Sequence, residues 1–449
     1  MVSAAAAAVV GVWLGSVVAA ACVAGLAWAG TRSVVVAACC LCLGCLGVVA
    51  AERAWAQAVP RSLGPFQGWA TVVGDPAPFG AGVRFTVQIE GERFDSWLYG
   101  PAKHHVASRQ SGELVFVQGN REPLRAGDRR ARLRHVVGRF ELQFVGDWSS
   151  GSPLSRANTR VRGSLRRAAE SAMQPDEAAL FTGLVIGDDA RQSPAMVVAF
   201  RASGLSHLTA VSGQNVTFVL AAAAPVLRRL RPWWRLFTTL GLIGWFMALT
   251  RFEPSILRAG VMAMLAASAF VLGLRQSPIR LLAIAVAALV LVDPLLVWSV
   301  GFWLSVGATA GVTAVGPWLA HRLPGPIWLR TPVAVTLGAQ VGVLVPSWLV
   351  FHRLPLVSLP ANLLAVPVAG FVMLYGIPAG LLAAAMPQPV AAAVMMPAVV
   401  GTRWVSTVAL LAARLEPSSG WAWTGWAIIA CGTLLAVGRS RGRRPTVPI

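Results

Sequence analysis

The chain has 449 residues, of which 56% are hydrophobic and 12% charged, and its mean hydropathy is +0.65. Soluble domains carry about 25% charged residues, so this composition excludes a single water-soluble globule and an intrinsically disordered chain. Apolar windows of about 20 residues recur along the sequence, and each can cross roughly 30 Å of hydrocarbon. We therefore expect an α-helical, polytopic membrane protein.

The net charge and the cysteines restrict the possible functions less than the hydrophobic composition does. The 38 Lys and Arg residues outnumber the 18 Asp and Glu residues, which gives a net charge of +20. Such an excess suits cytoplasmic loops, an anionic lipid surface or nucleic acid, and it does not choose among them. The cysteines lie in apolar segments, and neither a phosphate-cradling GxxxxGK[ST] sequence nor a GxSxG elbow is present. The sequence therefore predicts no metal, no cofactor and no catalytic residue.

The first third of the chain predicts two different structures. Residues 1–55 predict two N-terminal transmembrane helices, near 5–29 and 33–51. Residues 60–148 contain dispersed charges, glycine turns and five runs typical of strands, at 67–73, 83–90, 93–98, 113–118 and 133–145. Five short strands in a segment of this length predict a small β-barrel, of the OB-like kind.

Residues 153–175 predict a basic amphipathic helix. Arg156, Arg160, Arg166 and Arg167 share one broad face of it. This face suits lipid headgroups, and a stripe that contacts DNA is the alternative.

Residues 176–438 contain nine further apolar segments, near 206–226, 233–250, 255–273, 279–293, 296–319, 331–351, 356–381, 389–413 and 421–438. The total is then about 11 transmembrane segments. Arginines cluster in alternate loops and in the basic tail 439–449. The positive-inside rule therefore predicts a cytoplasmic C-terminus and an extracellular β domain, in a protein of the inner or plasma membrane.

Polar side chains interrupt the apolar segments at a few positions. Residues 204–216 read GLSHLTAVSGQNV, which places four of them within three helical turns: His207, Ser212, Gln214 and Asn215. Gly213, among them, allows close backbone approach or local unwinding. The four polar side chains form either a functional polar site or hydrogen bonds that pack helices together. Three more candidates lie near helix ends: Asp188, Arg258 and Asn362. An inward Arg258 would meet a phosphate or pair with Glu253, and snorkelling to the membrane surface is the alternative.

Five segments resemble motifs of the ComEC-type competence proteins, in the order in which that family has them. Residues 183–188 resemble its GLLLGD, and residues 204–216 resemble GLSHLLAVSGLHV. The other three are residues 254–262 (PSILRAGVM), 301–309 (GFWLSVGAT) and 361–367 (ANLLAVP). The resemblance covers roughly residues 180–370, and the β segment sits where the family has an extracellular OB-fold domain.

The sequence departs from the family at three places. Gln214-Asn215 stands where the family has Leu-His, so amides replace an imidazole, and Trp303 replaces a glutamine. Many members carry a metallo-β-lactamase-like domain after the channel. This sequence has no HxHxDH cluster, so we expect no nuclease activity from it.

The resemblance implies a membrane channel for single-stranded DNA in natural transformation. The polar residues of the helical core would line the path, and the β domain would gather the strand through arginines and aromatic rings: Trp69, Arg84, Trp97, Tyr99, Arg121 and Arg134. Implied partners, besides DNA and the lipid bilayer, are a DNA-receptor protein, a separate nuclease and a cytoplasmic motor or single-strand-binding protein. Homo-oligomerisation stays open. The alternative is a membrane protein of the same ancestry without DNA transport, either a small-solute transporter or an envelope binding or scaffold protein.

Overall fold

The computed structural model describes residues 1–100, 103–125, 127–209, 213–252, 254–274, 277–352, 355–417 and 419–441. The chain divides into two compact units. Unit 1 comprises Met1–Arg167, Trp245–Phe252 and Val286–Ser299. Unit 2 comprises Ala168–Gly244, Glu253–Ala285 and Val300–Ile449.

Unit 1 begins with three helices, α1 (Val2–Leu14), α2 (Val17–Thr31) and α3 (Val34–Ala56). The single helix predicted over 5–29 is thus divided in two. Gly15 ends α1 in the left-handed conformation, and the Ser16 hydroxyl accepts a hydrogen bond from the Ala19 amide to begin α2. Helices α1 and α3 pack with their backbones in contact, because a Cβ on Gly11 would overlap the Gly44 carbonyl.

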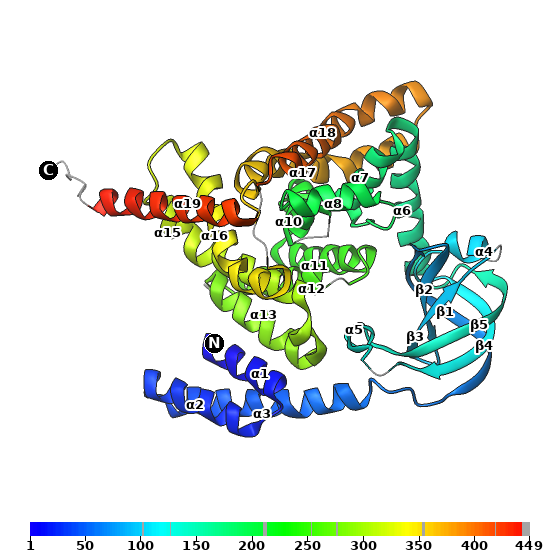
Figure 1. The fold of residues 1–449 in the computed structure, drawn as a ribbon, viewed down its shortest axis with the longest axis horizontal. Coiled ribbons are helices and arrows are strands. Elements are labelled where there is room, and N and C mark those ends of the chain that lie inside the picture. The colour runs from blue at the N-terminus through cyan, green and yellow to red at the C-terminus, as the bar shows by residue number, and fades with distance from the viewer. Residues whose placement is uncertain are drawn as a thin grey trace. The chain divides into compact units, whose positions relative to one another are not determined.

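The β domain is a closed five-stranded barrel (Figure 1). Its strands follow the order β1-β2-β3-β5-β4, with a parallel β3–β5 pair and antiparallel neighbours elsewhere. The bounds are β1 (Gly64–Phe79), β2 (Gly82–Ile89), β3 (Glu92–Leu98), β4 (Leu114–Pro123) and β5 (Val136–Ser149), with α4 (Lys103–Ala107) and α5 (Arg129–Arg132) between strands. The prediction of a small five-stranded barrel is therefore confirmed.

Strand β1 is longer than predicted because it closes the barrel. Its first half pairs with β4, and its second half pairs with β2 from Thr71 on, with an irregularity between Val73 and Ala77. Alternate side chains of all five strands then point inward and form a core that includes Phe85, Phe94 and Phe140.

A largely buried ion cluster ties the barrel to two other parts of unit 1. Asp75 of β1 pairs with Arg251, in the turn after α11 (Pro232–Leu249), and with Arg162 of α6 (Pro153–Ala172) at 3.4 Å. Arg162 also donates to the Leu249 carbonyl at 3.1 Å. Burial by itself raises the pKa of the Asp75 carboxyl, but the Arg251 and Arg162 guanidinium groups outweigh it and hold that pKa below its usual value. The Asp75 carboxylate therefore links β1, α6 and the turn after α11, three segments that are distant in sequence.

A second contact in unit 1 involves the loop that carries α5. His135 Nε2 lies 3.0 Å from Asp293 Oδ2, just before η1 (Pro294–Trp298). The Arg129 guanidinium lies over the rings of Trp55 and Trp298, at 5.7 Å and 5.8 Å from their centroids. The barrel is thus joined to helical segments through side chains as well as through the chain itself.

Unit 2 is helical. The boundary between the units falls within α6, α11 and α13 (Pro278–Val292). Its other elements are α7 (Pro175–Ile186), α8 (Pro194–Ala202), α9 (Ser206–Thr209), α10 (Gly213–Leu227), α12 (Pro254–Val271), α14 (Val300–Ala310), η2 (Gly311–Val315), α15 (Gly316–Ala320), α16 (Ile327–Phe351), α17 (Ser358–Ala383), α18 (Gln388–Leu415) and α19 (Ser419–Arg441). Helices α17 and α18 lie side by side (Figure 1).

Five helical stretches among the described residues are long and apolar enough to cross a membrane: Val34–Ala56, Val300–Ala320, Ile327–Phe351, Ser358–Ala383 and Gln388–Leu415. Shorter apolar helices accompany them, including α10, α12 and α13. The described parts of the nine predicted apolar segments fall largely on helices, and the count of about 11 crossings stays a prediction. The basic tail beyond residue 441 lies outside the described residues.

Candidate functional site

Arg258 is a guanidinium group held inside the helices of unit 2. It lies one turn into α12 and is only 5% exposed, so it does not snorkel to the surface. Its Nε and Nη2 donate to the Ser305 hydroxyl of α14 at 2.9 Å and 2.6 Å, and its Nη1 lies 3.4 Å from the Met262 sulfur. These acceptors are neutral, and within the described part of the chain no carboxylate forms an ion pair with it. Glu253, the predicted alternative partner, lies outside the described residues.

The start of α10 adjoins this guanidinium. A Cβ on Gly213 would lie 2.8 Å from the Ala259 Cβ and 3.4 Å from Arg258 Nη2. Only glycine allows such an approach without displacing a neighbour. The Ser255 hydroxyl lies 3.1 Å from the Ser305 hydroxyl on the other side. Segments 204–216, 254–262 and 301–309, which are far apart in sequence, therefore meet at Arg258.

Asn215 joins the same segment to α7. Its Nδ2 donates to the Leu184 carbonyl at 3.2 Å, and the residue is 2% exposed. Asp188 follows α7 and is also buried, with its amide donating to the Thr182 carbonyl at 3.2 Å. Asn215 therefore makes the helix-packing hydrogen bond that was the alternative to a functional polar role.

Ser358, at the start of α17, is a second polar junction. Its hydroxyl accepts from Gln340 Nε2 at 3.0 Å, and its carbonyl accepts from Asn362 Nδ2 at 2.7 Å. Gly204 has a φ of +72°, and a Cβ on it would lie 2.6 Å from the Ser358 Cβ. Asn362 Oδ1 is buried and has no hydrogen-bond partner among the described residues. The fifth motif, at 361–367, thus meets the segment that begins at Gly204.

The structure gathers only part of the predicted site. Gly213 and Arg258 are in contact, while Asn215, Asp188 and Asn362 are buried in neighbouring helix contacts. The side chains of His207 and Gln214 are exposed, and Ser212 lies outside the described residues. Sequence reasoning missed Ser305 and Ser358 as partners. Ser305 lies inside the 301–309 motif, which was the available signal.

The arginines predicted to bind DNA from the barrel are engaged in internal contacts. Arg84 and Arg134 pair with the buried Asp95 at 2.6 Å and 2.8 Å. Arg121 pairs with Glu90 at 2.9 Å. The Trp97 ring lies against the Arg84 guanidinium, 5.6 Å from centroid to Cζ. The carboxylates of Asp95 and Glu90 therefore offset part of this positive charge within the domain.

Aromatic rings are among the accessible groups of the barrel. Trp69 and Tyr99, both predicted, are exposed. Trp69 packs edge-to-face on Phe116 with centroids 5.8 Å apart. A Cβ on Gly146 would lie 3.0 Å from Phe144 Cε1 and 3.4 Å from Phe116 Cδ1. The side chains of Trp69, Phe116 and Phe144 thus form an outward surface across β1, β4 and β5, here called the aromatic face.

Potential metal ligands do not gather into a binding set in the part of the chain that the structure describes. Among the described residues there is no cluster of three or more His, Cys, Asp or Glu side chains able to hold a metal ion. The six cysteines are free thiols.

A buried arginine with neutral partners among apolar helices, together with a closed β-barrel, defines a helical membrane protein with an inserted β domain. The profile of the Competence protein family matches residues 184–442, which is more than half of the chain. The chain belongs to this family, of the ComEC type. The matched region contains all the residues of the polar cluster around Arg258.

Curated relatives agree with this membership. The chain is 26% identical to "ComE operon protein 3" of Bacillus subtilis (strain 168), over 56% of this chain and 32% of that one. It is 28% identical to "Competence protein ComA" of Neisseria gonorrhoeae, over 49% and 32%. It is 26% identical to "Uncharacterized protein YcaI" of Escherichia coli (strain K12), over 48% and 30%. The chain thus covers about a third of the length of each of these relatives. No solved structure matches it.

Proposed function

We propose that this protein is an inner-membrane channel component through which single-stranded DNA is taken up during natural transformation. The family that matches is described as competence protein, and one relative carries the printed name "Competence protein ComA". A single strand carries one negative charge per nucleotide, so it needs a polar path through hydrocarbon. The cluster around Arg258 supplies such polarity inside the helices.

The observation that carries the proposal is the state of Arg258. A buried charge is normally paired, because an isolated one is expensive to keep away from water. Arg258 instead has hydroxyl and thioether partners, which leave its positive charge uncompensated among the described residues. The phosphate of a passing strand would neutralise this positive charge. Weak, repeated contacts of this kind let a strand enter and also leave.

The β domain supports a role in gathering the strand. The order β1-β2-β3-β5-β4 in a small closed barrel supports the OB-like assignment. The aromatic face offers stacking surfaces, which every base can use regardless of sequence. The arginine-rich alternate loops support a β domain outside the cell and a cytoplasmic C-terminus.

Transport rather than catalysis fits the chemistry of the cluster, which consists of guanidinium, hydroxyl and amide groups. The energy for transport and the degradation of the other strand are then assigned to partner proteins, namely a DNA receptor, a nuclease and a cytoplasmic motor or single-strand-binding protein.

Photo-crosslinking during uptake tests the proposal. A photoreactive amino acid replaces Met262, beside Arg258, or Val345, on an exposed face of α16. In a transformable host we expect incoming labelled DNA to crosslink at position 262 and not at position 345. Crosslinks at neither position, in variants that still transform, would place the strand elsewhere. They would favour a protein of this ancestry without a channel role.

A further inference from the structure

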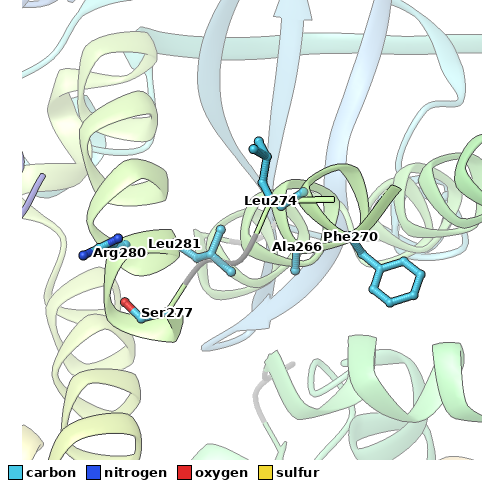
Figure 2. A pocket seen from close by; sticks show the side chains of 7 residues that line it. Ala266, Phe270, Leu274, Ser277, Arg280 and Leu281 are labelled. Atoms are coloured by element: carbon cyan, nitrogen blue, oxygen red, sulfur yellow. The ribbon is translucent and has the colours of Figure 1, made fainter. Parts of the chain in front are cut away.

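A cavity of about 620 Å³ opens between the C-terminal end of α12 and the start of α13. Its lining residues are Ala266, Ala269, Phe270, Leu274, Ser277, Arg280 and Leu281. Figure 2 shows Ala266 and Phe270 on the α12 side, with Ser277, Arg280 and Leu281 on the side of α13. The volume is within the range of about 300–1,000 Å³ that is typical of small-molecule sites.

The lining is apolar except at the start of α13. Five of the seven side chains are hydrocarbon, and the other two are the Ser277 hydroxyl and the Arg280 guanidinium. None of the seven is acidic. A second guanidinium, that of Arg235, lies 4.9 Å from the centroid of the Phe270 ring. The site therefore combines a hydrocarbon surface with positive charge and hydrogen-bond donors on the α13 side, and the Arg235 guanidinium lies beside Phe270 on the α12 side.

Neighbouring residues indicate the depth of this cavity in a membrane. The contact between Arg235 and Phe270 places the start of α11 beside the end of α12. Trp233 and Trp234, at that same start, are exposed. Tryptophan and arginine gather where hydrocarbon gives way to headgroups. The cavity is thus at headgroup level, with its apolar walls available to an acyl chain.

We propose that this cavity binds an anionic phospholipid. The phosphate is held by the Arg280 guanidinium and the Ser277 hydroxyl, and an acyl chain packs on Phe270, Leu274 and Leu281. The first turn of α13 adds the positive end of the helix dipole on the same side. A lipid without net negative charge would not balance the positive side of the site, and a fatty chain alone would contact only its apolar wall.

Native mass spectrometry of the purified full chain tests this inference, with phosphatidylglycerol or phosphatidylcholine added to the detergent. Both lipids carry a phosphate, but the choline cation of phosphatidylcholine adds a positive charge beside the Arg280 guanidinium. We therefore expect one more tightly retained molecule of phosphatidylglycerol than of phosphatidylcholine. Arg280→Gln should weaken its retention about tenfold, as the loss of one charge-assisted contact predicts. The matched control is Arg228→Gln, which removes an exposed arginine of the loop before α11.

A second variant tests the apolar half of the site. Ala269→Trp fills the cavity and leaves every charge in place, so it should also release the lipid, while thermal unfolding reports whether the chain still folds. Equal retention of the two lipids would overturn the proposal. An equal effect of Arg228→Gln would also overturn it, because the lipid would then be held by surface charge in general. Displacement of the lipid by inorganic phosphate would overturn it as well, because the cavity would then be a site for free phosphate.

Discussion

Arg258 of α12 and Ser305 of α14 are joined by two hydrogen bonds, from Nε at 2.9 Å and from Nη2 at 2.6 Å. The two residues are 47 positions apart in the sequence. This contact fixes a buried guanidinium by means of a neutral partner, so the group is positioned without being neutralised. Positioning and retained charge are the two properties that a contact with a moving phosphate chain requires.

The charge of the side chain at position 258 should affect transformation more than its volume does. Arg258→Met keeps the length of the side chain and removes the charge, and we expect it to reach the membrane in normal amounts and to lower transformation at least 100-fold. Arg258→Lys retains the charge and should keep part of the activity, although it loses the forked geometry. Transformation frequency and the amount of protein in the membrane fraction are the measurements.

The matched control for these variants is Arg403→Met, in α18. Arg403 is exposed and pairs with Glu177 at 2.8 Å, so the loss of its charge should leave transformation within about twofold of the parent, since exposed ion pairs contribute little. A tolerated Arg258→Met would show that this residue only packs helices.

Gly213 should accept no side chain. Gly213→Ala places a methyl group 2.8 Å from the Ala259 Cβ, which forces the start of α10 away from Arg258, and we expect a loss of transformation of at least tenfold. Gly241→Ala, in α11, meets no atom within 4 Å. It should be neutral, or stabilising by about 0.5–1 kcal/mol, because alanine favours a helix. Equal effects of Gly213→Ala and Gly241→Ala on transformation would contradict the role assigned to Gly213.

Asp75 should make the anchoring of the barrel sensitive to acid. Because the folded-state pKa of its carboxyl is lowered, its contribution to stability is fully present above the unfolded value of about 3.9 and is lost as pH falls through the folded value. Asp75→Asn should therefore destabilise the chain by about 3–5 kcal/mol at neutral pH, since it removes the carboxylate that pairs with both the Arg162 and the Arg251 guanidinium groups.

Thermal unfolding of the purified chain at several pH values measures this effect. The gap between the parent and Asp75→Asn should narrow as pH falls below about 4. Asp147→Asn, which changes an exposed carboxyl of the same domain, is the control and should show no comparable gap. A pH-independent gap would contradict the role assigned to the Asp75 charge.

The aromatic face should bind single strands. Trp69→Ala or Phe144→Ala in the full chain should weaken binding of a labelled oligonucleotide about 5- to 100-fold, as loss of one stacked base predicts. Phe79→Ala, which removes an exposed ring at the other end of β1, should have little effect. Binding should also fall steeply with salt. Unchanged affinity in both face variants would exclude this surface.

The local pattern of the sequence was enough to predict the strands and the positions of most apolar helices. Alternation and apolar length are local properties, and the barrel core and the nine helical segments follow from them. The break at Gly15 was missed because one left-handed glycine leaves no trace in hydropathy.

The candidate site could be predicted only in part, because its contacts are not local. Arg258 was found as a charge in an apolar helix, whereas Ser305 is an ordinary hydroxyl whose role depends on how α12 meets α14. The internal partners of the barrel arginines were not predicted for the same reason, and DNA binding by these arginines stays a prediction. Asp95 is 11 residues from Arg84 and 39 from Arg134, and only strand pairing and the barrel's closure bring these charges together.

Nuclease-protected uptake of labelled double-stranded DNA measures whether the chain is needed for DNA to cross the inner membrane. It compares a deletion strain of the native host with the same strain carrying the gene, and DNA bound at the surface is counted separately. The account predicts that surface binding persists in the deletion strain while protected DNA disappears and returns on complementation. Protected DNA at the parental level in the deletion strain would contradict a channel role.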